Sequence, residues 1–425
     1  MLKATVLVAT THRWYPTVRM AMALTKAGCQ VEAVCPPGHP LALTQAVRQM
    51  HTYYGLAPLL SFQNAIAGTK PDFIVPCDDL ATQHLHRLHE QERRSGEQGR
   101  QVCELIERSL GAAENYPLVS ARTAFMKLAH EEGVRVPLTS VIENTDELKQ
   151  WTSRVGFPTV LKANGSSGGD GIRVVHTVEE AEQAFRRLHA PPLLARAAKR
   201  ALIDGDKTLV WPSLLRRRSV VNAQAFVVGQ EATSSVLCWQ GSVLAALHFE
   251  VLKKVKPTGH ATVLRLIEHP EMSGAAEKIA RRLNLSGWHG LDFMLEAHTG
   301  NAYLIEINPR ITQVGHLALG PGHDLPAALY AALSGNPVRE APKVTEKDTV
   351  ALFPQEWVRD PESELLRSGY HDVPWEEPAL VNDAIRKSRT QRGWYLRQNS
   401  TARPHSLPIG ARPESRSVEV DCEAK

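Results

Sequence analysis

The sequence lacks paired cysteines, long apolar runs and a leader-like start. Its six cysteines include no C-x-x-C pair, and none clusters with histidines at metal-binding spacing, which argues against structural zinc and favours a reducing compartment. No segment approaches the roughly 20 apolar residues of a membrane-spanning helix. The first residues have only a short apolar run, unlike a signal peptide. We therefore expect a cytoplasmic protein with no membrane partner.

Two familiar nucleotide-binding loops and concentrated charge are also missing. The turn ATTHRWYP after the first apolar strand contains no G-x-G-x-x-G, so a dinucleotide-dependent oxidoreductase is the weakest interpretation. The glycine-rich stretch 165–171 is followed neither by G-K-[ST] nor by a helical pattern, which excludes a Walker A loop. The net charge is only +4 and the arginines are scattered, so the sequence indicates no nucleic-acid partner.

The length and patterning predict several domains. A chain of 425 residues is too long for one ordinary core, and two or three domains are expected. Residues 1–110 alternate apolar strands with helices, which is typical of a small doubly wound α/β domain. Its expected elements are strands over 3–10, 30–35 and 71–79 and a helix over 16–27 that ends at Gly28.

Ligands of such sheets bind at the carboxyl ends of the strands. The candidate substrate-side residues there are Thr10, Thr11, His12, Arg13, Cys77, Asp78 and Asp79. Further along, residues 120–133 predict an amphipathic helix with Ser120 as its N-cap and Gly133 as its C-cap. Further helices are expected over 271–283 and 323–333. After about residue 345 the chain becomes Pro-rich and irregular.

The most informative stretch is GLDFMLEAHTGNAYLIEINPR, residues 290–310. Alternating apolar and polar residues predict two short strands joined by a polar turn. Such a hairpin brings Asp292 near Glu306 and Asn308, which are two residues apart and share a face. Two carboxylates and an amide are the oxygen donors that suit Mg²⁺ on nucleotide phosphates. A solvated strand face with a capping asparagine is the alternative. Arg310 follows on the same side, where it could clamp a phosphate or an oxyanion.

Two more segments suggest phosphate and nucleoside contacts. In FPTVLKANGSSGGDGIRVV, Lys162 closes a strand before a glycine-rich loop whose backbone N–H groups can fold over phosphates, although glycine hairpins without ligands are common. In VVNAQAFVVGQEATSSVL, Gln224 sits among apolar residues and could read an adenine edge, and Glu231 could accept from ribose hydroxyls. A satisfied buried Gln and an exposed turn Glu are the alternatives.

In this order, over roughly residues 110–340, these motifs resemble the ATP-grasp superfamily. LDFMLE…YLIEINPR resembles its metal-binding pattern, and FPTVLKANGSSGGDGI resembles its second ATP lysine and flexible phosphate loop. The helix SARTAFMKLAHEEGVRVP resembles the earlier basic-residue helix of members related to carbamoyl-phosphate synthetase. The first α/β domain resembles the family's pre-ATP-grasp domain.

The resemblance implies an α/β and α+β architecture in which two α+β subdomains clamp ATP. The implied parts are a pre-ATP-grasp domain over 1–110, an ATP-grasp domain over 111–340 with subdomains 111–230 and 231–340, a C-terminal extension over 341–397 packed on the body, and a tail over 398–425. The tail is polar and rich in Pro, Ser and Arg, which is typical of disorder.

The resemblance also implies roles for individual residues. Arg122 and Lys162 would contact ATP phosphates, and Lys162 and Arg310 would act in catalysis. The residues implied to close over the phosphates are Ser166, Ser167, Gly168, Gly169 and Gly171. The remaining implied contacts are Gln224 at the adenine, Glu231 at the ribose, and Asp292, Glu306 and Asn308 around one or two Mg²⁺ ions, for which Mn²⁺ could substitute.

One departure from the family pattern concerns bicarbonate. Biotin-carboxylase-like members carry Gln-Val-Glu-His soon after the arginine, and the Glu is a base for bicarbonate. Residues 310–316 here read RITQVGH, with an extra residue and Gly315 in place of that Glu. The resemblance therefore does not imply bicarbonate activation. Nothing in the chain resembles a biotinyl or glutaminase domain.

The expected activity is an ATP-dependent ligase that phosphorylates a small-molecule carboxylate and couples it to an amine or similar nucleophile. A nucleotide-binding sensor or scaffold and an ATP-grasp kinase are the alternatives. The sequence contains no obvious general base. In the loop 315–326, His316, His323 and Asp324 could orient substrate, or Asp324 could simply cap the following helix. Relatives of this kind are often dimers, so a homodimer is one option.

Overall fold

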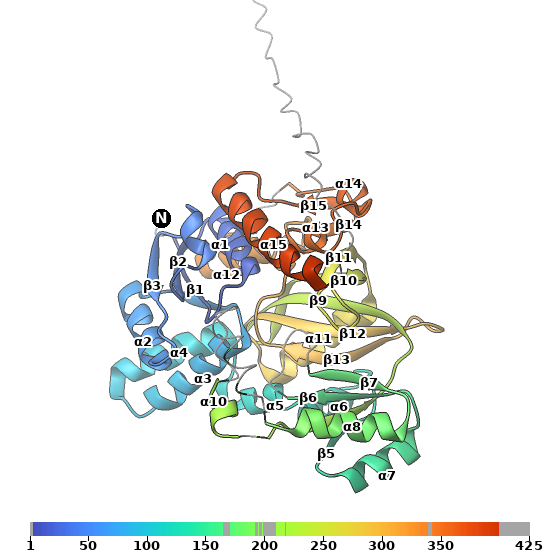
Figure 1. Cartoon of the computed structure of the whole chain (residues 1–425). Coiled ribbons are helices and arrows are strands. Elements are labelled where there is room, and N and C mark those ends of the chain that lie inside the picture. Colours follow the sequence, from blue (N-terminus) through green and yellow to red (C-terminus); the bar gives the residue numbers. More distant parts are fainter. Residues whose placement is uncertain are drawn as a thin grey trace, which may run out of the picture.

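A computed structural model of the chain describes residues 3–164, 171–191, 194, 198, 210–216, 218–338 and 342–398. Within them the strands form three sheets, which Figure 1 shows as three neighbouring bodies. A small parallel sheet lies in the blue N-terminal part, a small antiparallel sheet lies in the green part, and a large sheet lies between them. The C-terminal elements, drawn in orange and red, pack beside the large sheet and the N-terminal part.

The N-terminal part is a doubly wound α/β domain, as predicted. Its four parallel strands lie in the order β3-β2-β1-β4. They are β1 Thr5–Ala9, β2 Gln30–Cys35, β3 Gln49–Thr52 and β4 Phe73–Pro76, and the helices are α1 Tyr15–Ala27, η1 Pro40–Leu43, α2 Pro58–Thr69, α3 Asp79–Glu92 and α4 Gly96–Leu110. Pro16 lies in the first turn of α1, and Gly28 ends the helix at φ 114°, a left-handed conformation that glycine adopts without strain.

The second sheet is antiparallel, with the order β5-β8-β6-β7. Its strands are β5 Thr139–Ile142, β6 Thr159–Ala163, β7 Ile172–Val175 and β8 Val221–Ala225, accompanied by α7 Thr145–Val155, α8 Val178–His189 and α10 Val210–Leu214. Trp151 and Phe185, from α7 and α8, pack on Leu161, Val221 and Ala223. Because neighbouring residues in a strand point to opposite faces, Lys162, Asn222 and Gln224 face away from these helices.

The third sheet has seven strands in the order β13-β12-β9-β10-β11-β14-β15. They are β9 Gly229–Trp239, β10 Ser242–Lys254, β11 Ala261–Leu266, β12 Gly287–Glu296, β13 Ala302–Asn308, β14 Thr349–Leu352 and β15 Tyr370–Asp372. The helices near it are η2 Ala113–Asn115, α5 Tyr116–Ser120, α6 Arg122–Glu131, α11 Pro270–Leu283 and α12 Leu325–Ser334. One face packs on α6 and α11, and the other shares a core with α1 and α12.

Two local predictions, both about the caps of α6, were wrong. Ser120 does not cap α6: the N-cap position is Ala121, and the Ser120 hydroxyl donates to Pro117 O at 3.1 Å. Gly133 lies one residue beyond the C-cap, Glu132, although its φ of 68° still ends the helix. The stretch 220–237 is split between β8 and β9, so Gln224 and Glu231 belong to different sheets.

The C-terminal extension is more regular than its composition suggested. After β14 come α13 Gln355–Arg359, α14 Leu365–Ser368, β15 and α15 Pro378–Gln398. The strand β14 pairs with β11, so the extension continues the large sheet. The predicted disordered tail begins with the last residue of α15, and its remaining residues lie outside the described residues. Within the described ranges, no helix is both long and apolar enough to cross a membrane.

Candidate functional site

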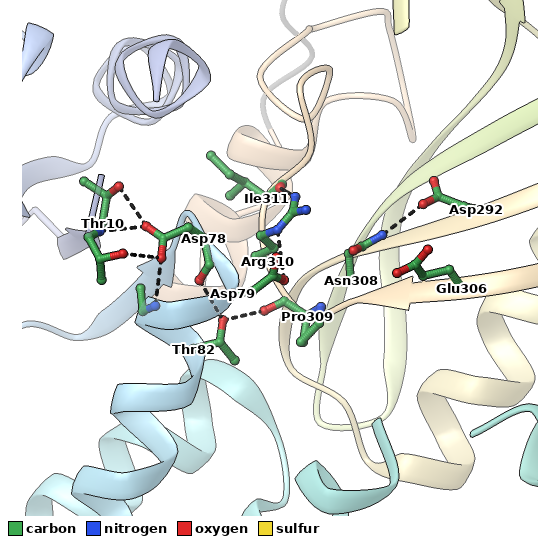
Figure 2. A network of polar contacts seen from close by, with 12 residues as sticks. Thr10, Asp78, Asp79, Thr82, Asp292, Glu306, Asn308, Pro309, Arg310 and Ile311 are labelled. Carbon is green, nitrogen blue, oxygen red and sulfur yellow. Dashed lines mark hydrogen bonds and ion pairs between the residues drawn. The ribbon is translucent and has the colours of Figure 1, made fainter. Parts of the chain in front are cut away.

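The hairpin over 290–310 forms as predicted and brings its polar residues together. Asp292 pairs directly with Glu306 across β12 and β13, and Asn308 pairs with Gly290. The Asn308 side-chain amide donates to one carboxylate oxygen of Asp292 at 3.0 Å (Figure 2). The Thr233 hydroxyl, from the neighbouring strand β9, donates to the other at 2.8 Å. The predicted acid–amide group is therefore a single cluster on one face of the large sheet.

Arg122 joins this cluster from the start of α6. Its Nη2 donates to Glu306 at 3.0 Å. Its Nε and Nη1 are buried and have no hydrogen-bond partner in the part of the chain that the structure describes. Buried donors without partners are costly, so these two N–H groups suit an anionic ligand such as a phosphate.

Lys162 approaches the same cluster from β6. It is only 3% exposed, and burial, followed by the positive charge of Arg122, lowers the pKa of its ammonium to about 8. Glu306, Asp292 and Glu231 act in the opposite direction on this pKa, so all of these groups share one electrostatic environment. A buried lysine beside unpartnered arginine donors is arranged to receive negative charge.

The two carboxylates differ in their protonation. Burial and then the adjacent Glu306 raise the pKa of Asp292 to about 6. Burial also opposes ionisation of Glu306, but Arg122 and Lys162 outweigh it and hold its pKa below the ordinary value. Two adjacent carboxylates that resist joint ionisation are relieved by a cation between them. No three His, Cys, Asp or Glu side chains converge on a metal position within the described ranges, so the fitting donor set is this pair with the Asn308 amide.

Arg310 links the cluster to the N-terminal domain. Its Nε donates to Asp79 at 3.0 Å (Figure 2). Its guanidinium lies 5.5 Å from the ring centroid of Trp14. The Thr82 hydroxyl donates to Pro309 O at 2.8 Å and fixes the preceding residue. The carboxyl edge of the parallel sheet therefore faces the end of the hairpin.

Several of the residues predicted at this edge make structural contacts within the N-terminal domain. Asp78 caps α3 by accepting from Ala81 N at 2.8 Å, and it also accepts from Thr10 and Thr11. Cys77 is fully buried, and burial raises the pKa of its thiol. Arg13 donates to Pro37 O. The edge groups that remain accessible are Asp79, which pairs with Arg310, and His12, which lies near Asp78.

The predicted nucleoside contacts lie on both sides of this cluster. The Gln224 side-chain amide is buried and donates to Thr139 Oγ1 at 3.1 Å. Glu231 forms an ion pair with Lys254, so its carboxylate is already partnered. Of the predicted phosphate loop, Gly171 accepts from Ala163 N at 2.9 Å. The predictions for Ser166, Ser167, Gly168 and Gly169 lie outside the described residues.

The three polar residues predicted in the loop 315–326 make different contacts. Asp324 is the N-cap of α12 and accepts from Ala327 N at 3.0 Å, which is the structural alternative that the sequence offered. His323 Nδ1 lies 2.7 Å from Ala246 O, and its Nε2 lies 3.2 Å from Glu268. His316 instead pairs with Asp372 of β15, at 2.7 Å.

Two site residues were missed in the sequence. Asn222 accepts from Thr123 Oγ1 at 2.7 Å and donates to Asn164 Oδ1 at 2.8 Å, which ties β8 to α6. Its position two residues before Gln224, on the same face, was the available signal. Thr233 carries no signal of its own, because only the strand pairing places it beside Asp292.

Comparison with known proteins identifies this arrangement. Residues 121–320 match the family model described as the ATP-binding domain of the carbamoyl-phosphate synthase L chain. This segment, just under half of the chain, belongs to the ATP-grasp superfamily. The matched segment includes every residue of the cluster, from Arg122 to Arg310.

Several large carboxylases match about half of this chain. Acetyl-CoA carboxylase 2 of Arabidopsis thaliana is 25% identical over 211 residues, which is 48% of this chain and 8% of that protein. Mitochondrial pyruvate carboxylase of Homo sapiens is 22% identical over 247 residues, which is 58% of this chain and 18% of that protein. The chain therefore matches less than a fifth of the length of these relatives.

Solved structures share the fold of about four fifths of this chain. The biotin carboxylase domain dimer of Hydrogenobacter thermophilus 2-oxoglutarate carboxylase, with MgADP and bicarbonate, is 17% identical, with a TM-score of 0.54, 80% of this chain covered and 71% of that one. N5-carboxyaminoimidazole synthase of Aspergillus clavatus, with ADP and 5-aminoimidazole ribonucleotide, is 14% identical, with a TM-score of 0.57, 79% covered and 78% of that chain. At these identities the likeness shows the fold alone.

Proposed function

We propose that this protein is an ADP-forming ligase that phosphorylates a small-molecule carboxylate with ATP and couples the acyl group to an amine or a similar nucleophile. In this proposal, residues 1–110 form the pre-ATP-grasp domain, 111–340 clamp the nucleotide, and 341–397 complete the body. The central support is the cluster in which the buried Lys162 and Arg122 lie beside Glu306 and Asp292.

The charges of this cluster suit nucleotide phosphates. Arg122 brings two N–H groups that lack partners among the described residues, and Lys162 adds a buried ammonium. Asp292, Glu306 and Asn308 supply the oxygens that would hold Mg²⁺ or Mn²⁺. A Mg²⁺ held by these residues would supply positive charge that neutralises the nucleotide phosphates. Lys162 and Arg122 stabilise the negative charge that remains on the transferring group.

The acyl step is assigned to the space between the hairpin and the N-terminal domain. There, Arg310 is held by Asp79 and Trp14 and can bind the substrate carboxylate and then the oxyanion formed on nucleophilic attack. Gln224 is assigned to the adenine, because its amide lies on the Lys162 face of the second sheet. Glu231 is assigned to the ribose, a role for which it would exchange its contact with Lys254. The glycine-rich loop 165–171 is assigned to phosphate closure.

Biotin-carboxylase-like proteins carry a glutamate that acts as the base for bicarbonate, and this chain has Gly315 at that position. The glycine supports an acid substrate other than bicarbonate. A Cβ on Gly315 would lie 2.8 Å from Ser235 Oγ, so this position is packed too tightly for a glutamate side chain.

A sensor would need no intact acid–amide–arginine group, and a kinase would release a stable phosphorylated product. A homodimer is part of the proposal, because the Hydrogenobacter domain is described as a dimer.

The test is release of ADP and phosphate from Mg·ATP across a panel of amino acids, other small carboxylates, bicarbonate and amines. Turnover that requires one carboxylate and one amine is the expected result. It should be abolished by Glu306→Gln and by Lys162→Ala, because these remove a metal ligand and a phosphate contact. Lys149→Ala is the matched control, since Lys149 is 55% exposed and lies in a surface pair with Glu182.

Each other outcome has a separate meaning. Tight ATP binding with no stimulated release would favour the sensor. A phosphorylated product that accumulates without an amine would favour the kinase. Bicarbonate as the sole effective acid would contradict the argument from Gly315.

A further inference from the structure

A buried ion network joins three distant segments of the chain. His316 follows the Arg310 loop, Asp372 ends β15, and Arg19 lies in α1. The His316 and Asp372 side chains approach to 2.7 Å (Nε2–Oδ2), and Arg19 donates to the other Asp372 oxygen at 2.5 Å. The Asp372 and His316 side chains are only 3% and 5% exposed. The C-terminal extension therefore contributes a carboxylate to the interior of the ATP-grasp body.

The protonation of Asp372 determines the tautomer of His316. Burial opposes ionisation of Asp372, but Arg19 and then His316 outweigh it and lower the pKa to about 2. An ionised carboxylate only accepts hydrogen bonds, so Nε2 of His316 must be the donor. In the imidazole tautomer with its proton on Nε2, the lone pair is on Nδ1. Nδ1 has no hydrogen-bond partner among the residues that the structure describes.

The position of His316 suits the second step of the proposed reaction. Its neighbour Gly315 packs against Ser235 and Trp288, which lie on the same sheet face as Asp292. Trp288 and Asp292 are four residues apart, which corresponds to about 13 Å along the strand.

Helix α1 provides a second measure. Trp14 contacts Arg310 and Arg19 contacts Asp372, and five helical residues correspond to about 7.5 Å. Helix α1 therefore links the His316–Asp372 pair to Arg310, and Gly315 lies against the same face of the large sheet that carries Asp292.

We infer that His316 is the general base of the coupling step and that Asp372 is the residue that positions it. This inference rests on the proposed ligase function. The nucleophile nitrogen forms a bond to the acyl carbon, and the bond from that carbon to the phosphate oxygen breaks. Phosphate leaves with the electron pair, and the nitrogen proton passes to His316 Nδ1 and then to solvent. Asp372 orients the ring and stabilises the imidazolium.

The inference is tested in the full-length protein by giving the acyl group two alternative acceptors. Hydroxylamine is unprotonated and strongly nucleophilic at neutral pH, so it captures an acyl-phosphate as a hydroxamate without a general base. The natural type of amine must lose its proton. His316→Asn should therefore lower amide formation by about 100-fold or more and leave hydroxamate formation unchanged.

Asp372→Asn should cause the same selective loss to a smaller extent. His371→Asn is the matched control, because this buried imidazole precedes Asp372 but contacts the Phe353 ring instead. It should affect both products equally or neither.

The inference is overturned if amide formation survives in His316→Asn. It is also overturned if both products fall together, because the network would then be structural only. Failure of the proposed function looks different: the wild-type protein would form no hydroxamate with any carboxylate.

Discussion

The buried Lys162 allows a prediction that separates stability from function. Its pKa is about 8 instead of the ordinary 10.5, first because of burial and then because of Arg122. At neutral pH the folded protein therefore keeps a charged group that its surroundings disfavour. Each pH unit corresponds to about 1.4 kcal/mol, so the charge costs about 3 kcal/mol of folding free energy. Lys162→Met removes this cost, and we expect the variant to be more stable by up to this amount.

The pH dependence gives the sign of the effect. The folded-state pKa is lower than the unfolded one, so the unfolded chain binds more protons between about pH 8 and 10.5. The cost is therefore fully present below about pH 8 and disappears as the pH rises toward 10.5. The stability of Lys162→Met should lack this contribution, so the difference between the two proteins should shrink with rising pH.

The assay is urea unfolding of the free protein at a series of pH values, without nucleotide or metal. Lys149→Met is the control, because this exposed lysine pairs with Glu182 at the surface and should contribute less than about 1 kcal/mol. Isothermal titration should also show that Lys162→Met no longer binds ADP tightly. The reasoning is refuted if Lys162→Met is no more stable than the wild type at pH 7, or if the stability difference does not change with pH.

Three further predictions concern the carboxylate pair and the packed loop. Glu306→Gln should weaken Mg²⁺-dependent ADP binding in calorimetry by about tenfold or more, while metal-free ADP binding should change little. The pKa of Asp292 is about 6, so Mg²⁺ titrations should weaken as the pH falls below this value, and Thr233→Val, which removes a hydrogen bond to the carboxylate, should move the midpoint to higher pH. Gly315→Ala should lower the unfolding free energy by about 1–3 kcal/mol through overpacking, whereas Gly274→Ala, with open space around its Cβ, should not.

The local sequence pattern was enough to predict the N-terminal domain and the hairpin over 290–310. The strand over 30–35 and the register of Asp292 with Glu306 follow from short apolar runs and strict alternation, which depend little on distant contacts. The pattern also predicted that Arg122 and Lys162 belong with the hairpin, through the resemblance to a known family. Their electrostatic coupling to Glu306 agrees with that expectation.

Contacts between distant segments were not predictable in the same way. Asp372 lies 56 residues from His316, and no pattern around either residue signals their pairing. The C-terminal extension looked irregular because its prolines interrupt every local pattern, yet β14 is held as a strand by pairing with β11. Gln224 and Glu231 read as one stretch, but the chain changes sheets between them at residues 226–228.

The central claim is that the carboxylate is activated as an acyl-phosphate. The most direct measurement uses the effective carboxylate labelled with ¹⁸O at both oxygens, with Mg·ATP and the amine, followed by mass analysis of the phosphate released. The account predicts that the phosphate carries an ¹⁸O atom from the carboxylate, and that Glu306→Gln releases no labelled phosphate. Coupled product accompanied by unlabelled phosphate would contradict it.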